Sequence, residues 1–157
     1  MAEPRTLIIG VGNSDRGDDG AGLAAASRLL ERLRIDDGIR VIEHWGEATG
    51  LVDAMTGWDE VLIVDAASSG ATPGSYRIFE VGETALPSDL ADMSSHGFGV
   101  PQAIELARAL SSLPARCRVY AIEGVVFDIG APLSDVVQEA VKAVVEDILL
   151  STEVMHA

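Results

Sequence analysis

The chain has 157 residues, of which 25 are acidic and 11 are basic, so its formal net charge at pH 7 is −14. A surface this negative repels nucleic-acid backbones and anionic membranes, which excludes both as partners. The single cysteine, Cys117, excludes an internal disulfide and favours a cytoplasmic location, and every apolar run is far shorter than the roughly 20 residues of a membrane span. We expect one domain over residues 1–157.

The first half of the chain predicts three strands with helices between them. A buried strand at Thr6–Val11 leads into a helix from about Gly20 to Arg34, with Leu23, Ala26, Leu30 and Leu33 on its inward face. The remaining elements of this half are a strand at Ile39–Trp45, a short helix at Gly50–Met55 and a strand at Glu60–Ala67. The continuous apolar centre of the last strand is typical of a strand that is covered on both faces.

The second half predicts two more strands and two long helices. A strand is expected in "SYRIFEV" (residues 75–81) and another in "CRVYAIEGV" (residues 117–125). A long loop follows the first of these strands and leads to a helix from Pro101 to about Leu113, with Ala103, Leu106, Ala107 and Leu110 inward. Ser134 is placed to cap the last helix, in which Val137, Val141, Val145 and Leu149 stack, and the terminal "STEVMHA" is expected to fray.

The order of these elements predicts a three-layer α/β/α fold around a five-stranded, mostly parallel sheet. The connection over residues 68–74 is short and rich in Gly and Pro, so it leaves no room for a crossover helix. We therefore expect the fourth strand to be antiparallel and to lie at an edge of the sheet.

The stretch "GVGNSDRGDDGAG" (residues 10–22) has the glycines of a phosphate-binding turn but the charges of a cation site. A dinucleotide fingerprint needs a glycine where this chain has Asp15, and two more carboxylates, Asp18 and Asp19, would repel a pyrophosphate. We therefore predict no nucleotide cofactor. One carboxylate could cap the helix that follows, but a cap needs only one, and here two stand in tandem.

Three polar side chains should meet beyond the carboxyl ends of the strands, where sheets of this kind bind ligands. These are Asp19, Asp65 at the end of the third strand, and His96 in the long loop. Each has an ordinary structural alternative, since a strand-end Asp often accepts hydrogen bonds from loop amides and a lone His is more often a loop residue than a ligand. Together, two carboxylates and one imidazole make a reasonable set of ligands for zinc or nickel. His44 is a weaker candidate for the same cleft, and His156 is expected to be inert.

The motifs as a set resemble the hydrogenase maturation endopeptidases. The resemblance runs through "GVGNSDRGDDGAG", "VLIVDAA" (61–67), "SSHGFGVPQAIELA" (94–107), "AIEG" (121–124) and "GAPLSDVVQEAV" (130–141), in order and over nearly the whole chain. It implies a five-stranded mixed sheet with an antiparallel fourth strand. It also implies a metal-assisted, aspartic-type endopeptidase that removes a C-terminal peptide from the nickel-loaded precursor of a nickel–iron hydrogenase large subunit. Asp19, Asp65 and His96 match the metal-contacting, catalytic positions, and the nickel would arrive with the substrate. Zinc or cadmium should also fit the site.

One departure from the family pattern falls after the second strand. Members usually carry a turn close to Gly-Gly-Thr-Ala-Gly, whereas this chain has "HWGEATG", with Trp45 and Glu47 added. This change could alter which precursor is accepted. Two alternatives to the processing enzyme stay open: another metal-dependent peptidase or amidase on the same fold, and a non-enzymatic assembly factor that binds a nickel protein. For Cys117 the prediction is a buried residue far from His96, without a nucleophilic role.

Overall fold

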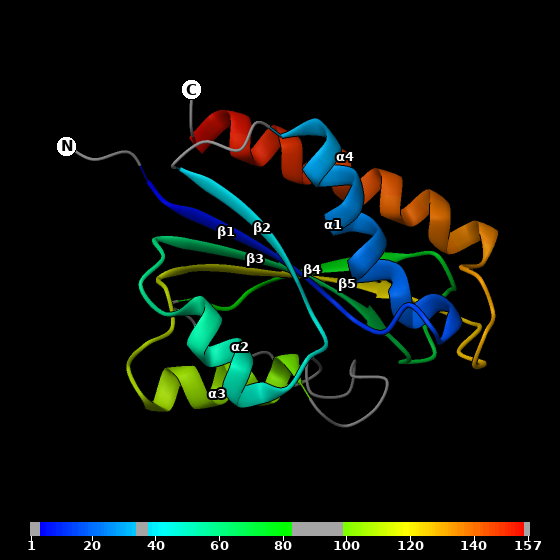
Figure 1. Cartoon of the computed structure of the whole chain (residues 1–157), viewed down its shortest axis with the longest axis horizontal. Helices are drawn as coiled ribbons and strands as arrows, with labels where there is room; N and C mark the ends of the chain where they lie inside the picture. The colour runs from blue at the N-terminus through cyan, green and yellow to red at the C-terminus, as the bar shows by residue number, and fades with distance from the viewer. Residues whose placement is uncertain (1–3, 34–37, 83–98, 156–157) are drawn as a thin grey trace.

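The computed structural model describes residues 4–33, 38–82 and 99–155 of the chain, which form a mixed sheet between two layers of helices (Figure 1). In chain order the elements are β1 (Thr6–Val11), the 3₁₀ turn η1 (Gly17–Gly20), α1 (Ala21–Arg32), β2 (Ile39–His44), α2 (Ala48–Met55), β3 (Glu60–Ala67), β4 (Tyr76–Glu80), α3 (Val100–Ala109), β5 (Arg116–Glu123) and α4 (Asp135–Met155). No helix within these ranges is long and apolar enough to cross a membrane.

The sheet has the order β2-β1-β3-β5-β4. Strands β2, β1, β3 and β5 run parallel to one another, and β4 pairs antiparallel with β5 at one edge. This confirms the predicted α/β fold with an antiparallel fourth strand. The short connection between β3 and β4 explains the direction of β4, because a parallel return would need a crossover of a dozen or more residues.

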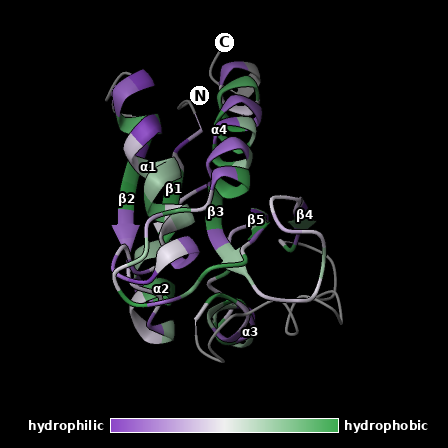
Figure 2. Cartoon of the chain, turned by 90° about the vertical axis from the view of Figure 1, so that its right-hand side faces the viewer, coloured by the Kyte–Doolittle hydropathy of each residue, from purple (hydrophilic) through white to green (hydrophobic). Residues whose placement is uncertain are grey.

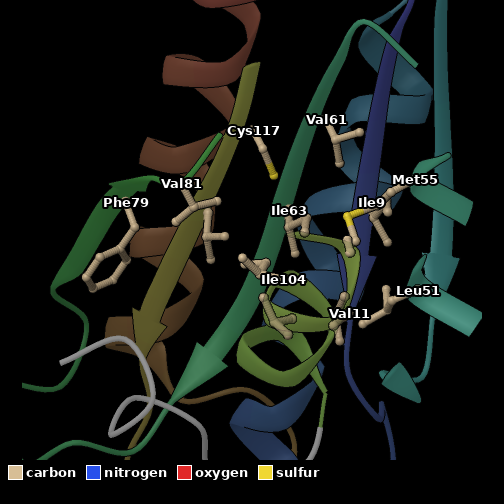
Figure 3. Close-up of a cluster of buried hydrophobic side chains, with 14 of the residues drawn as sticks. Ile9, Val11, Leu51, Met55, Val61, Ile63, Phe79, Val81, Ile104 and Cys117 are labelled. Atoms are coloured by element: carbon tan, nitrogen blue, oxygen red, sulfur yellow. The ribbon is translucent and has the colours of Figure 1, made fainter. Parts of the chain in front are cut away.

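Each face of the sheet has its own apolar core. Helices α1 and α4 cover one face, and α2 and α3 cover the other (Figure 1). Figure 3 shows the core under α2 and α3, where Ile9, Ile63 and Ile104 are among the side chains that point into it. Since β1 and β3 lie inside the sheet and are covered on both sides, nearly all their side chains are buried, as the continuous apolar run predicted.

The inward face of α1 was predicted wrongly in part. Leu30 is exposed and Leu23 only partly buried, whereas the fully buried residues are Ala21, Gly22, Ala25, Ala26 and Leu29. The reason is a close approach of backbones. A Cβ at Gly22 would lie 2.3 Å from the carbonyl oxygens of Val11 and Val64, so the helix can rest on the sheet only through its small residues.

Two helix ends also differ from the prediction. Helix α3 stops at Ala109, which leaves Leu110 exposed instead of inward. Helix α4 continues to Met155, so most of the segment that was expected to fray is helical, and Thr152 is buried with its hydroxyl donating to the carbonyl of Leu149 at 3.0 Å. Hydrophobic periodicity locates a helix better than it locates its last turn.

Candidate functional site

The loop between β1 and α1 turns back on itself and places two aspartates beside the carboxyl end of the sheet. The amide of Gly12 donates to the carbonyl of His44 at 3.0 Å, and the amide of Asn13 donates to the carbonyl of Asp19 at 3.1 Å. A Cβ at Gly12 would lie 2.0 Å from that Asp19 oxygen. The glycine is therefore needed for the turn that brings Asp19 next to the end of β1.

Asp18 ties this loop to the segment that joins β5 to α4. Its buried carboxylate accepts hydrogen bonds from the amides of Val125, Val126 and Ser134 at 2.7–2.9 Å and from the hydroxyl of Ser134 at 2.9 Å. Burial opposes the charged form, but these hydrogen bonds outweigh it and hold the pKa of Asp18 below its usual value. Asp18 is thus a structural anchor, a role that sequence reasoning missed.

Neither Asp18 nor Asp19 caps α1. The residue at the cap position is Gly20, and it makes no side-chain hydrogen bond. The two carboxylates instead have different roles: Asp18 holds the backbone, while Asp19 is buried and its charge acts on Asp65 of β3. The tandem pair in the sequence was the signal for two roles, although only the structure shows which residue takes the anchoring one.

Asp65 lies near the carboxyl end of β3, partly buried, with one carboxylate oxygen accepting from the amide of Ala66 at 2.8 Å. Burial raises the pKa of Asp65 to about 7, the amide of Ala66 opposes the rise, and the negative charge of Asp19 adds to it. The structure therefore brings Asp19 and Asp65 close enough for one charge to shift the titration of the other. Their roles as metal ligands stay a prediction.

The predicted third member of the site cannot be placed, because His96 lies outside the described residues, as does His156. Within the ranges 4–33, 38–82 and 99–155, no three His, Cys, Asp or Glu side chains are grouped so as to hold a metal ion. His44, the last residue of β2, accepts from the amide of Gly46 through Nδ1 at 2.9 Å. Burial lowers the pKa of His44, although the charge of Glu47 opposes this, so the imidazole is neutral at pH 7. Its Nδ1 can then accept the hydrogen bond that holds the turn at Gly46.

Two further carboxylates near this edge shape the backbone. Glu47 caps α2, since its side chain accepts from the amides of Thr49 and Gly50 at 2.8 Å. Glu123 is buried at the end of β5 and accepts from the amide of Ser69 at 2.9 Å and from its hydroxyl at 2.6 Å. Glu is not among the residues preferred at a cap position, and the sequence prediction began this helix at Gly50. Nothing local in the sequence marked Glu123 as an anchor of the β3–β4 connection.

Cys117 lies at the start of β5, as predicted, and so at the end of the sheet away from Asp65. It pairs with Val61 in the register of β3 and β5, whereas Asp65 pairs with Ala121, four residues further along. Its side chain points into the apolar core (Figure 3). Burial raises the pKa of this thiol to about 12, so a thiolate nucleophile is absent at neutral pH.

The described residues of this edge therefore offer two chemical possibilities: attraction of a divalent cation to Asp19 and Asp65, or movement of a proton at Asp65. Two carboxylates at close range favour a bound cation, because the cation relieves their repulsion. A carboxyl group that titrates near neutral pH can also accept and return a proton during hydrolysis. Both uses suit an enzyme that cleaves an amide bond.

Comparison with known proteins points to one family. Residues 24–151 match the family model described as HycI, hydrogenase maturation protease. A protein of Methanocaldococcus jannaschii that is named as a hydrogenase maturation protease is 33% identical over 156 residues, which cover 95% of this chain and 97% of that one. The chain spans 53% to 72% of the length of its HupD, HupM and HoxM relatives.

Solved structures agree with the fold. The [NiFe] hydrogenase maturation protease HybD of Thermococcus kodakarensis superimposes with a TM-score of 0.71 at 27% identity, covering 96% of this chain and 99% of that chain. The hydrogenase maturating endopeptidase HybD of E. coli gives a TM-score of 0.80 at 20% identity, covering 95% and 92% of the two chains. At that lower identity the likeness is one of fold.

Proposed function

The chain belongs to the hydrogenase maturation protease family, and we propose that it removes a C-terminal peptide from the nickel-loaded precursor of a nickel–iron hydrogenase large subunit. The observation that carries the proposal is the juxtaposition of Asp19 and Asp65 at the carboxyl end of the sheet. In a peptidase, a carboxylate pair at a ligand-binding edge is a place for hydrolytic chemistry.

In this proposal the nickel is part of the substrate. The precursor's nickel docks on Asp19, Asp65 and His96, and its positive charge polarises the scissile carbonyl or lowers the pKa of the attacking water. The two carboxylates supply the negative charge that attracts the cation. Asp18 supports them indirectly, because its hydrogen bonds hold the backbone from which Asp19 projects.

Hydrolysis also needs a proton to leave the water and to reach the departing amine. Either Asp65 or His96 could accept it from the water and pass it to the nitrogen as the C–N bond breaks. Asp65 suits this role when it is not bound to the metal, since its pKa is near neutral. The ligand role and the base role for Asp65 are alternatives, and the pH dependence of cleavage distinguishes them.

The test is the intact mass of the precursor before and after incubation with wild type, Asp19→Asn or Asp65→Asn. We expect wild type to remove one C-terminal peptide, and both variants to remain folded and inactive. As a matched control, Asp53→Asn changes an exposed aspartate of α2 and should cleave like wild type. Near-normal cleavage by Asp19→Asn would refute the metal-docking mechanism.

A further inference from the structure

Building on the proposed function, we propose that exposed apolar side chains on both sides of the acidic pair bind the precursor polypeptide across the bond that is cut. We call Trp45, Val125 and Ile129 the apolar rim. The rim would take an extended peptide segment that carries one apolar side chain on each side of the scissile bond.

The side chains of the rim are largely exposed. Ile129 is 82% and Trp45 79% exposed, the highest values among the large exposed apolar side chains of the described residues, and Val125 is 54% exposed. The chain's other tryptophan differs, since Trp58 stacks against the guanidinium groups of Arg5 and Arg40 at 4.4 and 5.6 Å. A single exposed apolar side chain needs no explanation, so the case for a binding surface depends on where these three side chains lie relative to the acidic pair.

The strand order places the rim on either side of the two carboxylates. Trp45 directly follows β2 and Val125 follows β5. Between them in the sheet lie β1, which leads into the turn η1 that carries Asp19, and β3, which carries Asp65. Figure 2 shows these strands side by side in the order β2, β1, β3, β5. The three spacings from β2 to β5 amount to about 14 Å, which an extended peptide crosses in roughly four residues.

The loop that carries Val125 and Ile129 is held firmly against the acidic loop. Besides the bonds to Asp18, the amide of Gly17 donates to the carbonyl of Ala131 at 3.1 Å and the amide of Gly130 donates to the carbonyl of Asp15 at 2.7 Å. A loop whose backbone is already ordered loses little conformational entropy when a partner binds to it. The geometry of this side of the rim is therefore fixed relative to Asp19.

The backbone after Trp45 is also held in place, by contacts with the end of β2 and with the start of α3. The amide of Gly46 bonds to the His44 side chain, and a Cβ at Gly99 would lie 2.7 Å from the carbonyl oxygen of Gly46. Gly99 itself has a φ of 116°, which glycine adopts readily. Trp45 is thus presented on a turn whose position is set by β2 and by the start of α3.

Charge decides between a peptide and a second copy of this chain as occupant. Two copies would each bring a formal charge of −14 to the contact, and each would bring its own acidic pair. A peptide that carries a cation at the bond to be cut neutralises that pair and leaves the rim to hold its flanking side chains. The structure therefore favours the precursor's own chain.

Cleavage kinetics on the nickel-loaded large-subunit precursor test the rim. Trp45→Ala and Ile129→Ser should each raise KM about tenfold or more with kcat within about twofold, because an exposed anchor contributes to binding and not to chemistry. Trp45→Phe should keep most of the affinity. The matched control is Leu150→Ser, which changes a side chain that is 62% exposed near the C-terminal end of α4. This end of α4 lies away from the carboxyl ends of the strands (Figure 1), so KM should be unchanged.

A fluorescence measurement gives an independent readout. Uncleaved precursor added to Asp19→Asn should shift the tryptophan emission to the blue, and the shift should disappear in Asp19→Asn/Trp45→Phe. If wild type is active and both Trp45→Ala and Ile129→Ser have the KM of wild type, the rim does not bind the precursor, and the proposed function stays intact. If wild type neither binds nor cleaves the precursor, the proposed function fails and the rim with it. Concentration-dependent dimers that Trp45→Ala abolishes would assign the rim to self-association instead.

Discussion

Replacing Asp65 by Asn should make the metal-free protein more stable, and increasingly so as the pH rises. In the folded chain burial and the charge of Asp19 raise the pKa of Asp65 to about 7, whereas an unfolded chain would titrate near 3.9. Folding therefore favours the protonated carboxyl. The protonated Asp65 carboxyl therefore contributes its full stability to the fold below about pH 4, and this contribution is lost as the pH rises towards and through 7.

The two pKa values set the size of the effect. A difference of about three units corresponds to a cost of roughly 4 kcal/mol at pH 8 and roughly 2 kcal/mol at pH 5.5. Asn is neutral at both values and can still accept from the amide of Ala66. Because Asp65 is partly exposed, screening reduces these figures, and the advantage of Asp65→Asn should grow by about 1–2 kcal/mol between pH 5.5 and pH 8. For a chain of this size that is about 2–8 °C in Tm.

Thermal unfolding in the presence of a chelator measures the difference at both pH values. The control is Asp53→Asn, which removes one negative charge from an exposed position on α2 and so corrects for the change in net charge. A raised pKa of Asp65 is contradicted if Asp65→Asn is less stable than wild type at pH 8, or if its advantage is the same at both pH values.

The other predictions concern single residues of the edge and its surroundings. Asp19→Asn should fold normally and lose at least about a hundredfold in precursor cleavage; a rate within tenfold of wild type would contradict its role. Asp18→Ala should destabilise the chain by about 3 kcal/mol or more, read as a drop in Tm of at least about 6 °C, because several buried donors lose their acceptor; an unchanged Tm would mean the β5–α4 loop is held by other contacts. Cys117→Ala should cleave within twofold of wild type, and a folded but inactive variant would reveal a thiol mechanism. Saturating zinc, nickel or cadmium should raise Tm by about 5–11 °C and magnesium much less, and a shift that persists in His96→Ala and Asp65→Asn would place the ion elsewhere on the acidic surface.

The strands and their directions could be predicted from the sequence because they depend on local and directional signals. The bounds of Thr6–Val11 and Glu60–Ala67 follow from continuous apolar runs, and the direction of β4 follows from the length of one connection. The inward face of α1 could not be predicted in the same way. The glycine and alanine positions that α1 buries are weakly hydrophobic, and the need for Gly22 comes from its close approach to carbonyls of β1 and β3, which no local pattern reveals.

The site shows the same division. That Asp19 and Asp65 meet follows from the rule that ligands bind beyond the carboxyl ends of parallel strands. The anchoring role of Asp18 did not follow, because its partners Val125 and Ser134 are more than a hundred residues away in the chain. The family resemblance gave the order of the motifs, but it could not show which of two adjacent carboxylates would hold the backbone.

Cleavage of a nickel-loaded precursor at the edge where Asp19 and Asp65 meet is tested most directly by the intact mass of that precursor. We predict that wild type removes a single C-terminal peptide from nickel-loaded precursor and leaves nickel-free precursor uncut. Asp19→Asn should cut neither form of the precursor. An unchanged mass of the nickel-loaded precursor would contradict the proposal and favour an assembly factor. Equal cutting of the nickel-free form by metal-stripped enzyme would show that the substrate's nickel takes no part.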